Sequence, residues 1–265
     1  MTGASTETDA ARVAVVTGAA SGIGRAAATR LRADGWAVVA VDRDADRLAW
    51  VDATGDAGLV SCSADVSADA GNAEIVAAAL DRFGRLDGVA LNAGVASSGS
   101  LESQSMDEVD RVLGVNLRGV ILGVRAAIPA LRASGGGAIV VTASVSGQYG
   151  DPTMWAYNAS KGGALNFARA AAIDLGADRI RVNAVCPGPI RSTGMTKPLE
   201  RHVPDLYEEM RSHVPLARWG EPDEVAAAIA WLLSDDASFI TGVALPVDGG
   251  VTASTGMTRP GFFTR

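Results

Sequence analysis

The stretch that decides the fold is Val13-Ala14-Val15-Val16-Thr17-Gly18-Ala19-Ala20-Ser21-Gly22-Ile23-Gly24, near the start of the chain. Its first four residues are apolar, as in a strand buried in a parallel sheet. The glycine-rich turn leads into a helix that we expect over residues 25–34. Glycines let the backbone approach a pyrophosphate, and a helix N-terminus offers free N–H groups and a positive dipole end. Such a turn alone could be structural, but between a strand and a helix it predicts a dinucleotide-binding loop. The loop contacts are expected from Gly18, Ser21, Gly22, Ile23 and Gly24.

The next strand-like run, residues 37–41, ends at Asp42. This carboxylate follows Gly24 at close to the spacing of about 20 residues that is typical of the group binding the adenosine ribose. A carboxylate accepts hydrogen bonds from both ribose hydroxyls and repels a 2′-phosphate, which favours NAD over NADP. Arg43 is a complication, because its guanidinium could attract that phosphate, or could instead lie over the adenine or in solvent. We predict NAD, with both residues at the adenosine end.

Strand-like and helical segments alternate along the rest of the chain. The alternation predicts a single α/β domain with a Rossmann-type doubly wound parallel sheet over residues 12–265, after a flexible tail of residues 1–11. Ligands of such sheets bind at the carboxyl ends of the strands. At two of these ends we expect cofactor contacts from Asp65, Val66, Asn92, Ala93 and Gly94. Asp65 could equally cap the helix that is expected to begin near Asp69.

A long helix, expected from Met154 to about Gly176, carries Tyr157 and Lys161 four positions apart. Their side chains share a face, with Cβ atoms about 5–6 Å apart. A phenol with an ordinary pKa of about 10 is a poor base at neutral pH. A nearby ammonium lowers that pKa and suits the phenol to proton exchange with a hydroxyl. Ser144, just past an expected strand at residues 138–141, could hydrogen-bond the same substrate oxygen.

Composition excludes several classes of function. The chain has 265 residues, 48% hydrophobic residues and a net charge of −7, without a basic run, so nucleic acid is not an expected partner. Residues 1–11 lack the features of a signal peptide, and no run approaches about 20 apolar residues, so we expect a soluble, cytoplasmic protein with no membrane partner. Two reduced, buried cysteines and no metal site are expected, since the two histidines have no metal-like spacing with carboxylates or cysteines.

Together these motifs resemble the short-chain dehydrogenase/reductase family over nearly the whole chain. The family's glycine motif matches residues 17–24, its Asn-Ala-Gly matches residues 92–94, and its Ser and Tyr-x-x-x-Lys match Ser144, Tyr157 and Lys161 at the usual separation. The resemblance implies that Tyr157 exchanges a proton with the substrate oxygen while hydride moves between the substrate carbon and the nicotinamide. Ser144 would orient that oxygen, and Lys161 would bind the nicotinamide ribose and lower the Tyr157 pKa.

The resemblance also assigns residues that the pattern alone leaves open. Asn116, within a helix expected from Met106 to Leu131, reads either as a satisfied core amide or as part of a polar relay. In the family it completes the catalytic tetrad and holds a water through its backbone. The family's segment for the nicotinamide carboxamide matches Pro187, Gly188 and Ile190, with a further hydrogen bond from Ser192 or Thr193. A homotetramer is implied, and residues 255–265 could fold onto a neighbouring subunit, which the sequence alone leaves open.

The sequence indicates the substrate less clearly than it indicates the cofactor. Residues 191–215 look irregular, and so long a loop predicts a mobile substrate lid. The expected pocket positions are Val95, Ala96, Val145, Tyr149, Trp155 and Met195. They are mostly apolar, which suits an alicyclic or aryl secondary alcohol or its ketone more than a sugar. Trp155 could instead merely pack the base of its helix.

Three functions remain in competition. The first is an NAD-dependent secondary alcohol dehydrogenase or ketone reductase. The second is a 3-oxoacyl thioester (acyl carrier protein) reductase using NADPH, which Asp42 and the acidic charge disfavour. The third is a non-catalytic cofactor-sensing protein, which the intact Ser144, Tyr157 and Lys161 disfavour.

Overall fold

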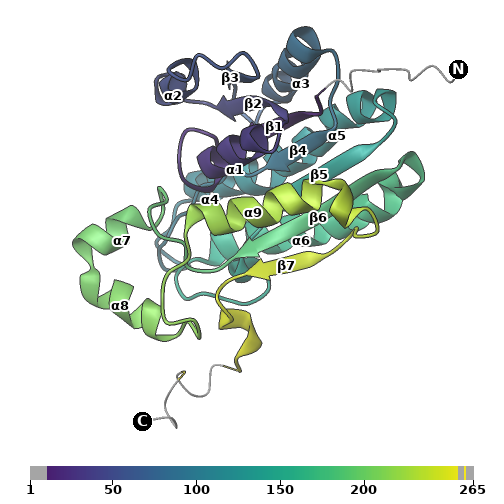
Figure 1. Cartoon of the computed structure of the whole chain (residues 1–265). Helices are drawn as coiled ribbons and strands as arrows, with labels where there is room; N and C mark the ends of the chain where they lie inside the picture. The colour runs from purple at the N-terminus through teal and green to yellow at the C-terminus, as the bar shows by residue number, and fades with distance from the viewer. Residues whose placement is uncertain (1–10, 256–259, 261–265) are drawn as a thin grey trace, which may run out of the picture.

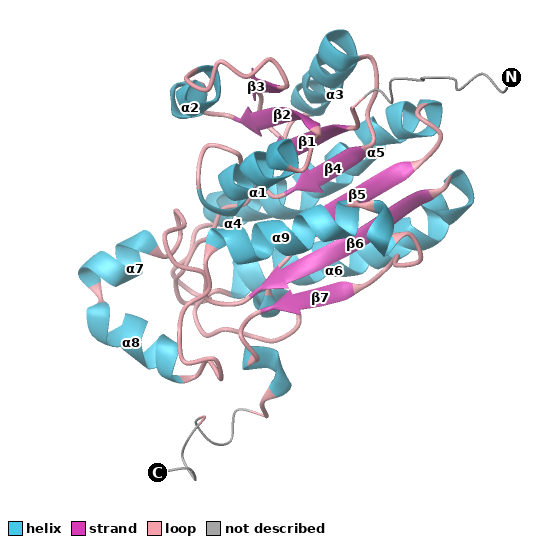
Figure 2. Ribbon diagram, viewed as in Figure 1, coloured by secondary structure: helices cyan, strands magenta, loops and turns pink. Residues whose placement is uncertain are grey.

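A seven-stranded sheet forms the centre of the computed structural model, which describes residues 11–255 and 260 (Figures 1 and 2). All strands are parallel and lie in the order β3-β2-β1-β4-β5-β6-β7. The strands are β1 (Val13–Thr17), β2 (Ala37–Asp42), β3 (Leu59–Ser63), β4 (Gly88–Leu91), β5 (Gly137–Thr142), β6 (Ile180–Pro187) and β7 (Ala244–Val247). The strand order turns back between β1 and β4, which is the switch point where ligands of such sheets bind. The predicted doubly wound parallel sheet is confirmed.

Helices cover both faces of the sheet, so β1 is buried on both sides. Val13 and Val15 belong to one core, and Ala14 and Val16 belong to the other, as the alternation of side chains along a strand requires. The first core is closed by α3, α5 and α6, and the second by α1 and α9 (Figure 1). The helices are α1 (Gly22–Ala33), α2 (Ala49–Asp52), α3 (Asp69–Phe83), α4 (Met106–Leu113), α5 (Gly119–Ala133), α6 (Trp155–Leu175), α7 (Lys197–His202), α8 (Pro204–Ser212) and α9 (Pro222–Leu233).

The helix expected from Met106 to Leu131 is not regular. A π-helical turn, η2 (Gly114–Arg118), separates α4 from α5 and contains Asn116. Such turns are rare and often mark functional sites. In the described part of the chain, residues 106–133 form the one helical run long and apolar enough to cross a membrane. Core helices share this length and apolar character, and α5 buries Leu122, Val124 and Leu131.

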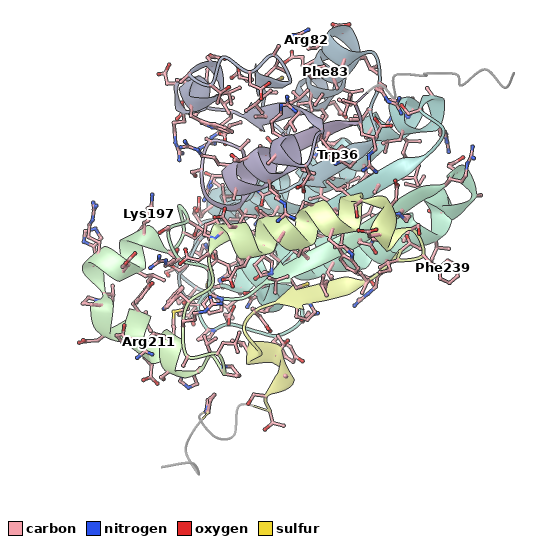
Figure 3. The ribbon with its side chains drawn as sticks, in the orientation of Figure 1. Trp36, Arg82, Phe83, Lys197, Arg211 and Phe239 are labelled. Atoms are coloured by element: carbon pink, nitrogen blue, oxygen red, sulfur yellow. The ribbon has the colours of Figure 1, made fainter. Side chains whose placement is uncertain are left out.

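The segment expected to be an irregular loop, residues 191–215, contains the helices α7 and α8. Each has a proline at its first turn, and neither has a buried residue. Figure 3 places Lys197 on α7 and Arg211 on α8, beyond the carboxyl ends of the strands. The ring of Tyr207 stacks on Trp219 at 4.1 Å between centroids, which anchors α8. The prediction missed these helices because they are short, and because their prolines also occur in irregular loops.

Both cysteines are free, as predicted. Cys62 is half-buried on β3 and Cys186 is buried on β6, on strands that do not neighbour each other. Burial raises the pKa of the Cys186 thiol to about 11, so this thiol stays protonated at neutral pH. Most of the predicted terminal segments, the tail at residues 1–11 and the contact at residues 255–265, lie outside the described residues.

Candidate active site

The glycine turn after β1 is packed too tightly for side chains. Gly18 has a φ of 70°, a left-handed conformation that favours glycine. A Cβ on Gly24 would lie 2.2 Å from the Gly18 carbonyl oxygen, which no other residue could tolerate. Gly22, at the start of α1, faces the opposite wall of the crevice, since a Cβ there would lie 3.5 Å from Thr193 Cγ2. The predicted glycine loop is thus a bare backbone surface at a helix N-terminus, which fits a pyrophosphate.

The ends of β1 and β4 are joined by one buried hydroxyl. Thr17 Oγ1 accepts the backbone N–H of Asn92 at 2.9 Å and that of Ala93 at 3.0 Å. Asn92 Nδ2 donates in return to the Thr17 carbonyl oxygen at 3.1 Å. This tie brings the predicted contacts at residues 92–94 beside the glycine turn, at the switch point of the sheet.

The adenosine end of the crevice carries more charge than the sequence indicated. Asp42 accepts the backbone N–H of Ala20 at 3.1 Å, so its carboxylate lies over the glycine turn. Arg47, which we did not predict, donates from Nη2 to the Ser21 hydroxyl at 3.1 Å. No motif marks Arg47, since it sits in a short 3-10 helix after β2.

Asp65 lies at this end as well. Hydrogen bonds from the Ser67 hydroxyl and then the Ser67 N–H lower the pKa of Asp65, and the charge of Arg43 adds to the effect. Val66 follows at the same strand end, and its carbonyl oxygen accepts from Asn72 Nδ2 at 2.8 Å.

The segment after β6 forms the other wall. Gly188 donates its N–H to the Val247 carbonyl oxygen at 3.1 Å, directly after Pro187 ends the strand. Ile190 is buried in the core, and its carbonyl oxygen accepts from the Thr196 hydroxyl at 2.7 Å. Ser192 has a φ of 60° and is exposed, whereas Thr193 faces Gly22. Of the two candidates for a carboxamide hydrogen bond, Thr193 therefore lies against the glycine turn.

Tyr157 and Lys161 are both buried on the same face of α6. They are 8% and 3% exposed, and Lys161 Nζ lies 5.7 Å from the centroid of the Tyr157 ring. Lys161 Nζ donates to the Thr142 carbonyl oxygen at 2.8 Å, at the end of β5. A Cβ on Gly94 would lie 3.3 Å from the same Nζ, so the end of β4 reaches the ammonium.

The pKa values of this pair differ from expectation. Burial raises the pKa of Tyr157, a hydrogen bond with Ser144 lowers it, and the negative charge of Asp151 raises it. Burial also lowers the pKa of Lys161 to about 8. The expected lowering of the Tyr157 pKa by Lys161 is therefore wrong for this structure. The reason is that burial penalises both charged forms and that the ammonium is directed at the Thr142 carbonyl.

Asn116 is completely buried and its side chain is fully satisfied. Its Oδ1 accepts the Val95 N–H at 2.8 Å, and its Nδ2 donates to the Val95 carbonyl oxygen at 2.8 Å and to Ser160 Oγ at 3.0 Å. Ser160, which we did not predict, donates to the Tyr157 carbonyl oxygen at 2.7 Å. The side chain is thus a satisfied core amide that ties the end of β4 to the helix turn carrying Tyr157.

The six predicted substrate positions are not equivalent. Val95 and Trp155 pack in a small apolar cluster with Val109 and Val112, which favours the packing interpretation of Trp155. Val145 follows Ser144 directly. The remaining three lie at the margin: Ala96 accepts a hydrogen bond from Arg111, and Tyr149 and Met195 are 62% and 39% exposed.

The chain is similar to known proteins over nearly its whole length. A family model described as Enoyl-(Acyl carrier protein) reductase matches residues 18–252. The meso-2,3-butanediol dehydrogenase of Serratia marcescens is 40% identical, over 94% of this chain and 97% of its own. The cis-4-hydroxycyclohexanecarboxylate dehydrogenase of Sinomonas cyclohexanicum is 42% identical, over 93% and 99%. A crystal structure of levodione reductase superposes with a TM-score of 0.87 at 37% identity, covering 92% of this chain and 98% of that one.

Proposed function

The chain belongs to the short-chain dehydrogenase/reductase family, and on this basis we propose that it is an NAD-dependent enzyme interconverting a small cyclic or aryl secondary alcohol and its ketone. As a member of this family it is an oxidoreductase that acts on CH–OH groups with a nicotinamide cofactor. The observation that carries the proposal is the burial of Tyr157 and Lys161 on one face of α6, with Ser144 buried just past the end of β5, at the edge that holds the glycine turn.

The residues present fit the cofactor. Gly18 and Gly24 let the turn pack closely against the end of β4 and against itself, where a Cβ would clash, and a Cβ on Gly94 would lie 3.3 Å from the Lys161 ammonium. We assign the pyrophosphate to residues 18–24, the adenosine to the end of β2 and the nicotinamide carboxamide to residues 187–193. The nicotinamide, when bound, supplies or accepts the hydride.

The chain's own residues then handle the proton and the substrate oxygen. Tyr157 exchanges a proton with that oxygen at its hydroxyl, and Ser144 hydrogen-bonds the same oxygen. Burial keeps the Tyr157 phenol protonated at neutral pH, which suits proton donation to a ketone. Lys161, held by the Thr142 carbonyl, presents its ammonium to the ribose hydroxyls. Asn116 holds the end of β4 and the Tyr157 turn together.

The choice of NAD rests on Asp42. Its carboxylate lies over the glycine turn, where a 2′-phosphate would meet a negative charge. Arg47 on Ser21, and Arg43 near Asp65, are the opposing charges. We expect Asp42 to favour NAD more strongly than the two arginines favour NADP, because both arginines are exposed and exposed charges are well screened.

The substrate class follows from the apolar positions and from the relatives. Val95, whose backbone hydrogen-bonds to Asn116, and Val145, which follows Ser144, offer apolar side chains at the site, and the named relatives act on butanediol, hydroxycyclohexanecarboxylate and levodione. We further propose that α7 and α8 act as the substrate lid, that the enzyme is a cytoplasmic homotetramer, and that exposed apolar residues such as Ile173 and Phe239 lie at its interfaces.

A turnover screen tests the proposal. The protein is incubated with NAD⁺ and, separately, NADP⁺ against cyclic, aryl, aliphatic diol and sugar alcohols, and reduced nicotinamide is followed by its absorbance. We expect turnover of cyclic or aryl secondary alcohols with NAD⁺. Preference for NADPH together with a 3-oxoacyl thioester would instead establish the reductase of acyl carrier type. No turnover in either direction would overturn the enzyme assignment.

A further inference from the structure

A tryptophan holds the glycine turn from outside, and the reaction outlined above does not use it. Trp50 lies in α2, and its indole Nε1 donates a hydrogen bond to the Ala19 carbonyl oxygen at 3.1 Å. Ala19 is completely buried, so water cannot take the place of the indole at this carbonyl. The contact therefore ties α2 to the turn that we assign to the pyrophosphate.

The peptide group between Ala19 and Ala20 is held at both of its edges. A trans peptide is planar, with its carbonyl oxygen and its N–H at opposite edges. Trp50 bonds the carbonyl edge, and the N–H edge, which belongs to Ala20, donates to Asp42 Oδ2 at 3.1 Å. The preceding N–H, that of Ala19, donates to the Val41 carbonyl oxygen at 2.9 Å. A rotation of this peptide plane would thus break the bonds to Trp50 and Asp42 together.

Trp50 is itself firmly placed. Its ring packs against the second core, which contains Leu48 and Val51 from the same short stretch of chain, both of them buried. The guanidinium of Arg25 lies over the ring, 4.8 Å from its centroid, in a favourable cation–π contact. The direction of the indole N–H is therefore fixed by contacts that are independent of the Ala19 carbonyl.

The orientation of the Asp42 carboxylate depends on the same peptide. Its Oδ2 accepts from Ala20, and its Oδ1 accepts the Asp44 N–H at a longer 3.3 Å. A carboxylate that backbone donors hold in place cannot swing away from a 2′-phosphate. It also presents its free lone pairs to the ribose hydroxyls without losing side-chain freedom on binding.

We propose that Trp50 is a positioning residue for the choice of cofactor: by fixing the peptide between Ala19 and Ala20, it keeps Asp42 in the orientation that accepts the ribose of NAD and rejects the 2′-phosphate of NADP. The inference rests on the proposed use of NAD and adds the residue that enforces it. A tryptophan with a merely structural role would stabilise the fold without changing the ratio of the two affinities.

The variant Trp50→Phe removes the indole N–H and keeps an aromatic ring for the core and for Arg25. Fluorescence titration gives the dissociation constants of NADH and NADPH for the wild type and the variant. Because the freed carboxylate binds the ribose less well and yields to the phosphate, the ratio of the NADPH constant to the NADH constant should fall. We expect a fall of about tenfold, the factor that one hydrogen bond typically contributes.

The matched control is Trp36→Phe. Trp36, labelled in Figure 3, packs in the same core and also lies beneath an arginine, with the Arg12 guanidinium 4.4 Å from its ring centroid. It directly precedes β2, so it lies at the opposite end of that strand from Asp42. We expect Trp36→Phe to leave the ratio of the two affinities unchanged.

Three outcomes of the titrations would overturn the inference. One is an unchanged ratio in Trp50→Phe, and another is an equal loss of affinity for both cofactors, which would mean that Trp50 shapes the pyrophosphate turn alone. The third, a wild type that prefers NADPH, would overturn the proposed use of NAD as well, so the two failures are distinguishable. Should Trp50→Phe unfold, a second variant carries benzothienylalanine in place of Trp50, which exchanges only the indole N–H for sulfur.

Hydrogen–deuterium exchange tests the hold on the peptide without any cofactor. Mass spectrometry of fragments that cover residues 18–24 compares the wild type with both variants. We expect the Ala20 N–H to exchange faster in Trp50→Phe, because a freed peptide plane lets this donor leave Asp42. Exchange as slow as in Trp36→Phe would refute the inference, and this result does not depend on whether the protein turns over any substrate.

Discussion

Replacing Thr17 tests whether one buried hydroxyl holds the cofactor crevice together. The side chain is 2% exposed, and its Oγ1 accepts the N–H groups of Asn92 and Ala93 at 2.9 and 3.0 Å. In Thr17→Val the shape is kept but both N–H groups lose their acceptor. An unsatisfied buried donor costs about 1–3 kcal/mol, and Asn92 and Ala93 are half-buried, so water satisfies them in part. We therefore expect a loss of about 2–4 kcal/mol in the free energy of unfolding.

The matched control is Thr17→Ser, which keeps the hydroxyl and loses one methyl, worth about 0.8 kcal/mol. Urea unfolding followed by circular dichroism gives the two free energies, and NADH titration by fluorescence gives the cofactor affinity. Thr17→Val should weaken NADH binding far more than Thr17→Ser, because residues 92–94 lie at the crevice. Equal stability and equal affinity for the two variants would refute the role assigned to this hydroxyl.

Three further predictions concern the reaction and its pH dependence. Tyr157→Phe should lower kcat by at least about 100-fold, as expected for loss of a general acid, with NADH affinity nearly unchanged; loss of both would contradict the proton-transfer role. Asp42→Ala should raise activity with NADP⁺ relative to NAD⁺, and an unchanged preference would show that Arg43 or Arg47 decides it. Lys161 has a folded pKa of about 8, below the ordinary 10.5, so the unfolded chain binds more protons between those values and the stability of the wild type rises with pH there. Below pH 8 we therefore expect Lys161→Met to be more stable than the wild type in urea unfolding. This difference in the free energy of unfolding should shrink by about 3 kcal/mol as the pH rises toward 10.5, and a difference independent of pH would disprove the lowered pKa of Lys161.

Much of the fold could be predicted because parallel strands buried on both faces are continuous apolar runs. The predicted strand at residues 37–41 matches β2 within one residue, and the predicted helix from Met154 agrees with α6 within one residue. The π-turn around Asn116 could not be predicted, since its cause is the tertiary contact of the Asn116 amide with Val95 and Ser160. The residues that neighbour Asn116 in the sequence do not predict such a contact.

The candidate site, like the fold, could be predicted only in part. The glycine turn, residues 92–94 and the pair on α6 could be placed because the topology of a parallel sheet brings strand ends to one edge. Arg47 and Ser160 were missed, because their roles depend on which side chain each one meets after folding. The raised pKa of Tyr157 was missed for a related reason: burial, which sequence spacing does not measure, is the largest influence on it.

The interior position of Lys161 has a consequence for attempts to make this protein more robust. Among the described residues no carboxylate pairs with this ammonium, whose contact is a carbonyl dipole. Selection for heat resistance alone would favour a neutral, apolar side chain at that position and would discard catalysis with it. Thermostable variants of this scaffold should therefore be sought on its surface, with the centre of α6 kept constant.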